Sequence, residues 1–170
     1  MNWVAPPSRR WIARVIICVL VTVLGTPAQS RWQVYSNDRF GYSMELPPGL
    51  QVSNRAADGS SVSWQTGTVR VQVSGSNNPY RIEPSEYFKR VRLAAADGIV
   101  EERTGSDEGR AWQESLYTKH GRRIHQKVFV GSGAINTLEF SYAYRYREEK
   151  ERLGQRVVES FRPGDLSRAH

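Results

Sequence analysis

The sequence contains very little cysteine, which narrows the chemistry available to the protein. Its one cysteine, Cys18, lies among the first thirty residues, a segment that we interpret below as a removable leader. Without that segment the chain has no thiol, so a disulfide, a thiol nucleophile and a cysteine metal site are all excluded. The stability of the folded protein must therefore come from its hydrophobic core.

Several signatures of catalysis and ligand binding are also missing. The sequence has no Gly-x-x-x-x-Gly-Lys phosphate loop. Ser132 stands directly between two glycines rather than in the Gly-x-Ser-x-Gly pattern of a nucleophile elbow, so we interpret it as a turn residue. The adjacent carboxylates at 101–102, 107–108 and 148–149 are typical of solvated pairs and single out no acid or base. The sequence therefore predicts no catalytic residue.

The three histidines do not predict a metal site. If His120 and Gly121 form the centre of a hairpin turn, His125 lies four or five residues further on, on the order of 15 Å from His120. That separation is too large for one ion to bind both side chains. We therefore expect two exposed histidines, no bound metal and no cofactor.

The first thirty residues predict an export signal. They contain three arginines and no acidic residue, followed by an apolar run from Val15 to Leu24. This run has the length of a signal-peptide core, roughly 7–15 residues, whereas a membrane-spanning helix needs about 20. Ala28, Gln29 and Ser30 fit a cleavage site, so residues 1–30 are predicted to be a signal peptide.

The export route and the fate of the leader leave alternatives open. Residues 8–14 loosely resemble a twin-arginine signal, but Ala13 is weakly apolar where that signal is strongly apolar, and we favour the general secretory route. A lipoprotein is disfavoured because Cys18 follows Ile17, where a lipobox needs a small residue. We expect a periplasmic or secreted protein; the alternative is an inner-membrane protein with an uncleaved signal anchor.

The chain after the leader predicts one folded domain. Its 140 residues keep 21 basic and 17 acidic side chains, a net charge of +4, compared with +7 for the whole sequence. An aromatic content of 11% argues against disorder. We assign residues 31–163 to the domain, which we expect to be monomeric, and residues 164–170 to a flexible C-terminal tail.

Two periodicities predict the secondary structure. Helical spacing of apolar residues predicts helices at 84–96 and 144–160. Strands are predicted at 32–35, 40–46, 50–54, 61–65, 69–74, 99–104, 112–119, 122–130 and 134–142, most clearly where valines alternate with polar residues. Because the strands are grouped rather than alternating strictly with helices, we predict the α+β class, with an antiparallel sheet flanked by helices.

A basic hairpin is the strongest candidate for a binding site. With His120 and Gly121 at the turn, Glu114 lies opposite Lys127 and Trp112 lies opposite Phe129, which are favourable cross-strand neighbours. We predict that the cationic side chains of the second strand contact an anionic partner. These residues are Arg122, Arg123, His125 and Lys127. The alternative is a solvated edge whose cations deter strand addition.

Motifs near the two ends of the chain after the leader resemble PsbP-like domains. Phe40-Gly41-Tyr42-Ser43 precedes a short strand and a proline, and Ser160-Phe161 is similar to the ending of their last helix. Ser76-Asn77-Asn78-Pro79 resembles small secreted proteins of this group from Gram-negative bacteria. The resemblance implies an α/β/α sandwich around an antiparallel sheet. The family includes a thylakoid-lumen subunit of photosystem II and eukaryotic proteins that bind a small GTPase, and both act by docking to partners.

Leader, composition and resemblance together predict an exported, non-catalytic binding or accessory module of the bacterial cell envelope. Its expected partner is an envelope protein or an anionic surface. Nucleic acid is disfavoured, because an exported protein rarely meets it and the net charge is modest. The alternative is an envelope enzyme of hydrolase type, which would require a cleft that gathers carboxylates or a serine with a base.

Overall fold

The strands and helices follow the periodicity of the sequence. A computed structural model describes residues 31–95, 97–107 and 110–170, so the predicted signal peptide lies outside the described residues. The elements are β1 (Gln33–Ser36), β2 (Ser43–Leu46), β3 (Gln51–Arg55), β4 (Ser61–Gln65), β5 (Val69–Asn77), α1 (Pro84–Ala95), β6 (Gly98–Asp107), β7 (Arg110–Lys119), β8 (Arg122–Val130), β9 (Ala134–Ala143), the 3-10 helix η1 (Tyr144–Tyr146) and α2 (Arg147–Ser160).

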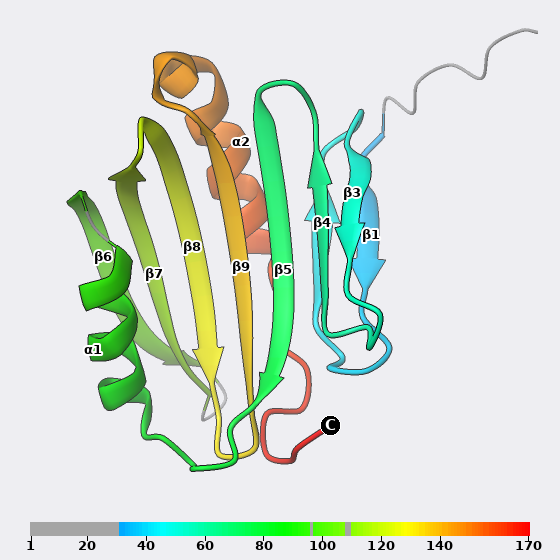
Figure 1. The fold of residues 1–170 in the computed structure, drawn as a ribbon, viewed down its shortest axis with the longest axis vertical. Coiled ribbons are helices and arrows are strands. Elements are labelled where there is room, and N and C mark those ends of the chain that lie inside the picture. Colours follow the sequence, from blue (N-terminus) through cyan, green and yellow to red (C-terminus); the bar gives the residue numbers. More distant parts are fainter. Residues whose placement is uncertain (1–30, 96, 108–109) are drawn as a thin grey trace, which may run out of the picture.

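Seven of the strands form one antiparallel sheet in the order β3-β4-β5-β9-β8-β7-β6, and β1 pairs with β2 in a separate ribbon (Figure 1). The edges of the large sheet are β3 and β6, while β8 lies inside it. The alternative interpretation of the basic hairpin as a solvated edge is therefore wrong. It failed because strand order depends on long-range pairing that local charge does not report.

The β7–β8 hairpin has the predicted turn and register. His120 and Gly121 have φ angles of 50° and 70°, the left-handed pair that a type I′ turn requires. His120 is exposed, as predicted. The strands place Glu114 opposite Lys127 in the expected register.

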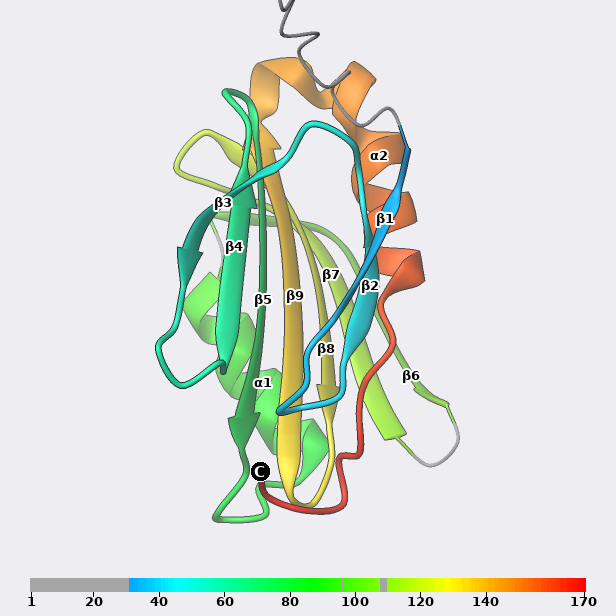
Figure 2. The ribbon, with the colours of Figure 1, turned by 90° about the vertical axis from the view of Figure 1, so that its right-hand side faces the viewer.

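One helix covers each face of the sheet (Figure 2). On one side lie α2 and the β1–β2 ribbon, which enclose the main core; on the other lies α1. A smaller cluster under α1 joins Tyr87 and Phe88 to Val128, Val130 and Ile135 of the sheet. The predicted α+β class, with an antiparallel sheet flanked by helices, is confirmed. No helix within the described ranges is long and apolar enough to cross a bilayer.

Helix α2 lies close against the sheet at Gly154, which is buried. A Cβ atom added at Gly154 would lie 2.7 Å from Cδ1 of Phe140 and 3.1 Å from Cδ2 of His125. Such distances are shorter than van der Waals contact, so only glycine permits this approach. Gly154 therefore sets how tightly α2 covers β8 and β9.

The C-terminal segment packs against the domain rather than extending from it. Leu166 is buried in the main core, and its carbonyl accepts hydrogen bonds from the backbone N–H groups of Gly133 at 2.9 Å and Ala134 at 3.2 Å. The backbone N–H of His170 donates to Oδ1 of Asn77 at 2.8 Å. The structure thus differs from the predicted flexible tail, because Leu166 gains apolar burial and the segment finds backbone partners.

Candidate functional site

The four residues predicted to bind an anionic partner point to two opposite faces of the sheet. All of them belong to β8; they are Arg122, Arg123, His125 and Lys127. Because successive side chains of a strand point to opposite faces, Arg122 points to the α1 side and the other three point to the α2 side. The structure therefore does not bring the four side chains together.

Arg123 and His125 are buried beneath α2, and each is only 8% exposed. Nη2 of Arg123 lies 3.4 Å from Oε1 of Glu151 on α2. The His125 ring packs against the rings of Phe140 and Tyr142, with centroid distances of 6.3 and 6.0 Å. The expectation of an exposed His125 is wrong, because α2 covers the face to which the strand periodicity assigns it.

Lys127 is enclosed by neighbours on the same face. Its Nζ lies 3.9 Å from Oε2 of Glu114 and 5.3 and 5.4 Å from the ring centroids of Trp112 and Phe129. Burial lowers the pKa of Lys127, while the Glu114 carboxylate opposes that shift. The ion pair and the cation–π contacts hold the ammonium group within the fold. Its contact with an outside anion stays a prediction.

Arg122 belongs to a basic cluster on the opposite face, which we name the basic face and define as Arg70, Lys119 and Arg122 around Glu139. Nη2 of Arg122 donates to the carbonyl of Ser141 at 3.0 Å. Burial raises the pKa of Glu139, and the charges of the three cations act against this shift. A surface hollow of about 380 Å³ next to the β4–β5 turn is lined in part by Arg70, Arg122 and Glu139. Two cations and one carboxylate line this hollow, so positive charge exceeds negative charge within its lining.

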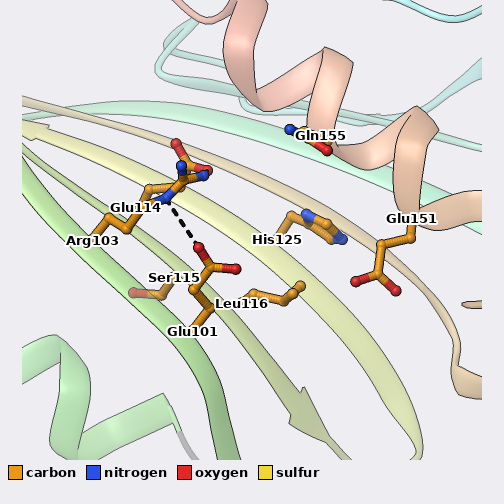
Figure 3. A pocket seen from close by; sticks show the side chains of 8 residues that line it. All are labelled: Glu101, Arg103, Glu114, Ser115, Leu116, His125, Glu151 and Gln155. Carbon is orange, nitrogen blue, oxygen red and sulfur yellow. Dashed lines mark hydrogen bonds and ion pairs between the residues drawn. The ribbon is translucent and has the colours of Figure 1, made fainter.

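A second, polar cavity lies between α2 and the strands β6, β7 and β8 (Figure 3), and we name it the α2 cavity. Its volume is about 170 Å³. The lining residues are Glu101, Arg103, Glu114, Ser115, Leu116, His125, Glu151 and Gln155. This is a polar concavity that gathers carboxylates, the feature that the enzyme alternative requires.

Opposite charges alternate around the α2 cavity. Nε of Arg103 lies 3.3 Å from Oε1 of Glu101, and its Nη2 lies 2.7 Å from Oε1 of Glu114. Lys127 lies beside Glu114 as a second cation, and Arg123 lies beside Glu151. The three carboxylates of the lining are therefore accompanied by three cations, and their formal charges cancel.

His125 is an unsatisfied polar side chain in the wall of this cavity. Its Nε2 is buried and has no hydrogen-bond partner. Burial lowers the pKa of His125 to about 4, with Glu151 opposing the shift and Arg123 adding to it. The imidazole is therefore neutral at neutral pH, and one of its ring nitrogens is a hydrogen-bond acceptor.

The arrangement suits the binding of a polar ligand better than acid–base chemistry at neutral pH. A general base works best when its pKa lies near the working pH, and that of His125 is well below it. Among the residues that the structure describes, no three histidine, cysteine, aspartate or glutamate side chains gather as metal ligands. The cavity instead offers hydrogen-bond donors and acceptors at short range.

Sequence reasoning did not find the α2 cavity. The pairing of Arg103 with Glu114 follows from the β6–β7 register, which the sequence analysis did not predict. No sequence pattern indicates that Glu151 and Gln155 line the cavity, because their position depends on where α2 crosses the sheet.

No protein-family model and no curated protein matches this chain. Among solved structures, cyanobacterial PsbP (CyanoP) from Synechocystis sp. PCC 6803 is similar, with a TM-score of 0.60, 16% identity, and coverage of 84% of this chain and 98% of that one. A Pseudomonas aeruginosa protein of unknown function, described as a putative regulator, has a TM-score of 0.48, 10% identity, and coverage of 78% and 97%. LpqN of Mycobacterium tuberculosis, described as involved in cell envelope biogenesis, has a TM-score of 0.39, 13% identity, and coverage of 83% and 87%.

The sheet order, the two covering helices and the docked ribbon define a helix–sheet–helix sandwich of the α+β class. More specifically, the chain has the PsbP-like fold, since the likeness to CyanoP extends over 98% of that protein. At 16% identity this likeness establishes the fold alone, so the function has to be argued from the residues.

Proposed function

We propose that this protein is an exported, non-catalytic accessory module of the bacterial cell envelope that binds an acidic protein partner. The signal-like first thirty residues support export. The docking roles implied by the PsbP-like resemblance support an accessory function. The observation that carries the proposal is the basic face, where Arg70 and Arg122 line one surface hollow together with Glu139, the one acidic residue of that lining.

The contact with the partner is centred on Arg122. This residue is half-buried and Arg70 is exposed, so both can meet a partner that approaches the uncovered part of the sheet. The predicted contacts Arg123, His125 and Lys127 contribute less, because they lie on the covered face. An excess of like charge on one surface speeds and orients association with an oppositely charged protein.

The test is a paired charge removal followed by affinity capture from the envelope of the source cell. Arg70→Gln with Arg122→Gln removes two charges from the basic face, and glutamine avoids placing a new carboxylate beside Glu139. Arg55→Gln with Arg81→Gln removes the same charge at exposed positions elsewhere. We expect the first pair to lose an acidic protein partner that the control pair keeps, and high salt to weaken the capture by the unmodified protein.

Anionic vesicles distinguish a lipid surface from a protein partner. The unmodified protein could bind phosphatidylglycerol vesicles as strongly as it captures any protein, and the Arg70→Gln and Arg122→Gln pair could lose that binding. This result would redirect the proposal to the membrane. Equal partner binding by both double variants would overturn the role of the basic face. N-terminal sequencing of the exported protein tests the leader: a start near residue 31 supports a released protein, and an intact leader supports the membrane-tethered alternative.

An envelope hydrolase is a second candidate, favoured by the convergence of Glu101, Glu114 and Glu151 on the α2 cavity. Its test is turnover of chromogenic glycosides, esters and phosphoesters by the purified protein. Turnover that Glu151→Gln abolishes would establish an enzyme. If the substrates are not turned over, the binding function remains the better account.

A further inference from the structure

We propose that the α2 cavity is a binding site for a small, neutral, polyhydroxylated molecule of about monosaccharide size. This site lies on the opposite face of the sheet from the basic face and does not depend on the proposed function. The proposal combines an unsatisfied buried side chain, the charge balance of the lining, the polarity of its groups and the size of the cavity.

The unsatisfied side chain is His125. More than nine-tenths of it is buried, it lines the cavity, and its Nε2 has no hydrogen-bond partner. Buried polar atoms nearly always have a partner, and leaving one without a partner costs about 1–3 kcal/mol. In Figure 3 the imidazole lies at the cavity beside Glu151 and Gln155 of α2. A ligand hydroxyl that reaches this atom from the cavity would supply the missing hydrogen bond.

The charge balance of the lining favours a neutral ligand. Arg103 contacts both Glu101 and Glu114, at 3.3 and 2.7 Å, so its charge is already compensated. Nη2 of Arg123 lies 3.4 Å from Oε1 of Glu151 and compensates the charge of that carboxylate too. A ligand with a net charge would enter a partly enclosed region without a free counter-charge, which is costly.

The polar groups of the lining match hydroxyls. Carboxylates and the neutral imidazole accept hydrogen bonds, the Arg103 guanidinium donates them, and the Gln155 amide can do both. A hydroxyl both donates and accepts, so adjacent hydroxyls can meet adjacent donors and acceptors. A purely cationic ligand would satisfy only the acceptors and would compete with the existing ion pairs.

The volume sets the size of the ligand. At about 30 Å³ per water molecule, 170 Å³ holds five or six waters. Sites for drug-sized molecules and cofactors usually exceed about 300 Å³. A single sugar ring or a short polyol therefore fits the cavity, whereas a nucleotide is too large.

The test follows the imidazole signals of His125 by NMR while small molecules are added to the processed protein. The probes are glucose, N-acetylglucosamine and glycerol as neutral polyols, putrescine as a cation and citrate as an anion. We expect at least one neutral polyol to shift the His125 signals saturably, and the two charged probes to leave them unchanged. Glu151→Gln and Gln155→Leu should each weaken polyol binding about tenfold or more, the effect of losing one good hydrogen bond.

Matched controls separate this site from general effects. Glu148→Gln changes an exposed carboxylate of α2 that does not line the cavity, and it should bind the polyol with unchanged affinity. The Arg70→Gln and Arg122→Gln pair should also retain polyol binding, so failure of the basic face would leave this proposal standing. If Gln155→Leu does not fold, the Glu151→Gln variant decides the result.

Three outcomes would overturn the proposal. No saturable shift with any polyol in the folded protein would mean that only water occupies the cavity. A response to putrescine or citrate that exceeds every polyol response would assign the cavity to a charged ligand. Equal weakening by Glu148→Gln and Glu151→Gln would place the binding elsewhere.

Discussion

At the residue scale, His125 makes the stability of the protein sensitive to acid. Burial lowers the pKa of His125 from 6.5 to about 4, while Glu151 opposes this shift, Arg123 adds to it, and the neutral Tyr142 ring packs alongside. The unfolded chain therefore binds a proton near pH 6.5, whereas the folded protein binds it only near pH 4. Since the unfolded state then holds more protons, the free energy of unfolding should fall on acidification through this interval, by on the order of 3 kcal/mol.

Urea denaturation across this pH range measures the effect. The matched variant is His125→Gln, which cannot titrate, so the difference in unfolding free energy between the two proteins should change between pH 6.5 and pH 4. Carboxylates elsewhere contribute equally to both and cancel. Parallel pH profiles for the two proteins would contradict the buried, neutral state of His125.

Gly154 is the residue that allows α2 to approach the sheet. In Gly154→Ala the new Cβ would lie 2.7 Å from Cδ1 of Phe140, a fully buried ring without room to move. We expect a loss of about 1–3 kcal/mol in the free energy of unfolding, as for other overpacked cores. Gly67→Ala is the control, because no atom lies within 4 Å of its added Cβ. Equal urea midpoints for the two variants would contradict the close packing.

At the scale of elements, the C-terminal segment is an integral part of the fold. Leu166 is 4% exposed and belongs to the main core. Leu166→Ala should lower the free energy of unfolding by about 2–4 kcal/mol through lost burial and the cavity left behind. Val34→Ala, at a position that is 74% exposed, should change it little. Chemical denaturation decides: a Leu166→Ala protein as stable as the control would mean that the segment is loosely held.

At the scale of the whole molecule, one core joins elements from both ends of the part of the chain that the structure describes. Phe40 of the connection between β1 and β2 and Phe161 after α2 are both fully buried in the cluster that also covers the sheet. A shared core makes unfolding cooperative, because no part keeps its burial without the others. We expect the processed protein to unfold in one transition.

Tryptophan fluorescence and far-ultraviolet circular dichroism provide the two probes of this transition. Trp64 lies within the main core, and Trp32 and Trp112 pack against it. The two thermal curves should superimpose. A fluorescence change that precedes the loss of secondary structure would show that the ribbon and α2 separate from the sheet first.

Local sequence was sufficient for most of the secondary structure and for the hairpin. Alternating valines predicted the buried face of β5, where Val69, Val71 and Val73 are all buried. His120-Gly121 predicted the position of the turn. The position of the turn fixes the register of the two strands, in which Glu114 lies opposite Lys127. These features depend on residues that are close together in the sequence, which is why they could be inferred.

The candidate sites could be predicted only in part. Strand periodicity puts Arg123, His125 and Lys127 of β8 on a common face, but it does not tell whether that face meets water. The position of α2 over β8 made that face an interior one. The alternation of side chains along the strand placed Arg122 on the opposite face. The binding role assigned to the four residues of β8 stays a prediction. In the proposed function, Arg122 on the basic face makes the central contact.

The amino-acid pattern alone therefore specified the elements, their class and the pairing of β7 with β8, since period, turn chemistry and charge act over short distances. Tertiary packing decided which strand lies at an edge, that the C-terminal segment is docked and that His125 is buried and neutral. It also assembled the α2 cavity from β6, β7, β8 and α2. These outcomes depend on contacts between segments far apart in the chain, where the free energy of burying one surface on another overrides local preference.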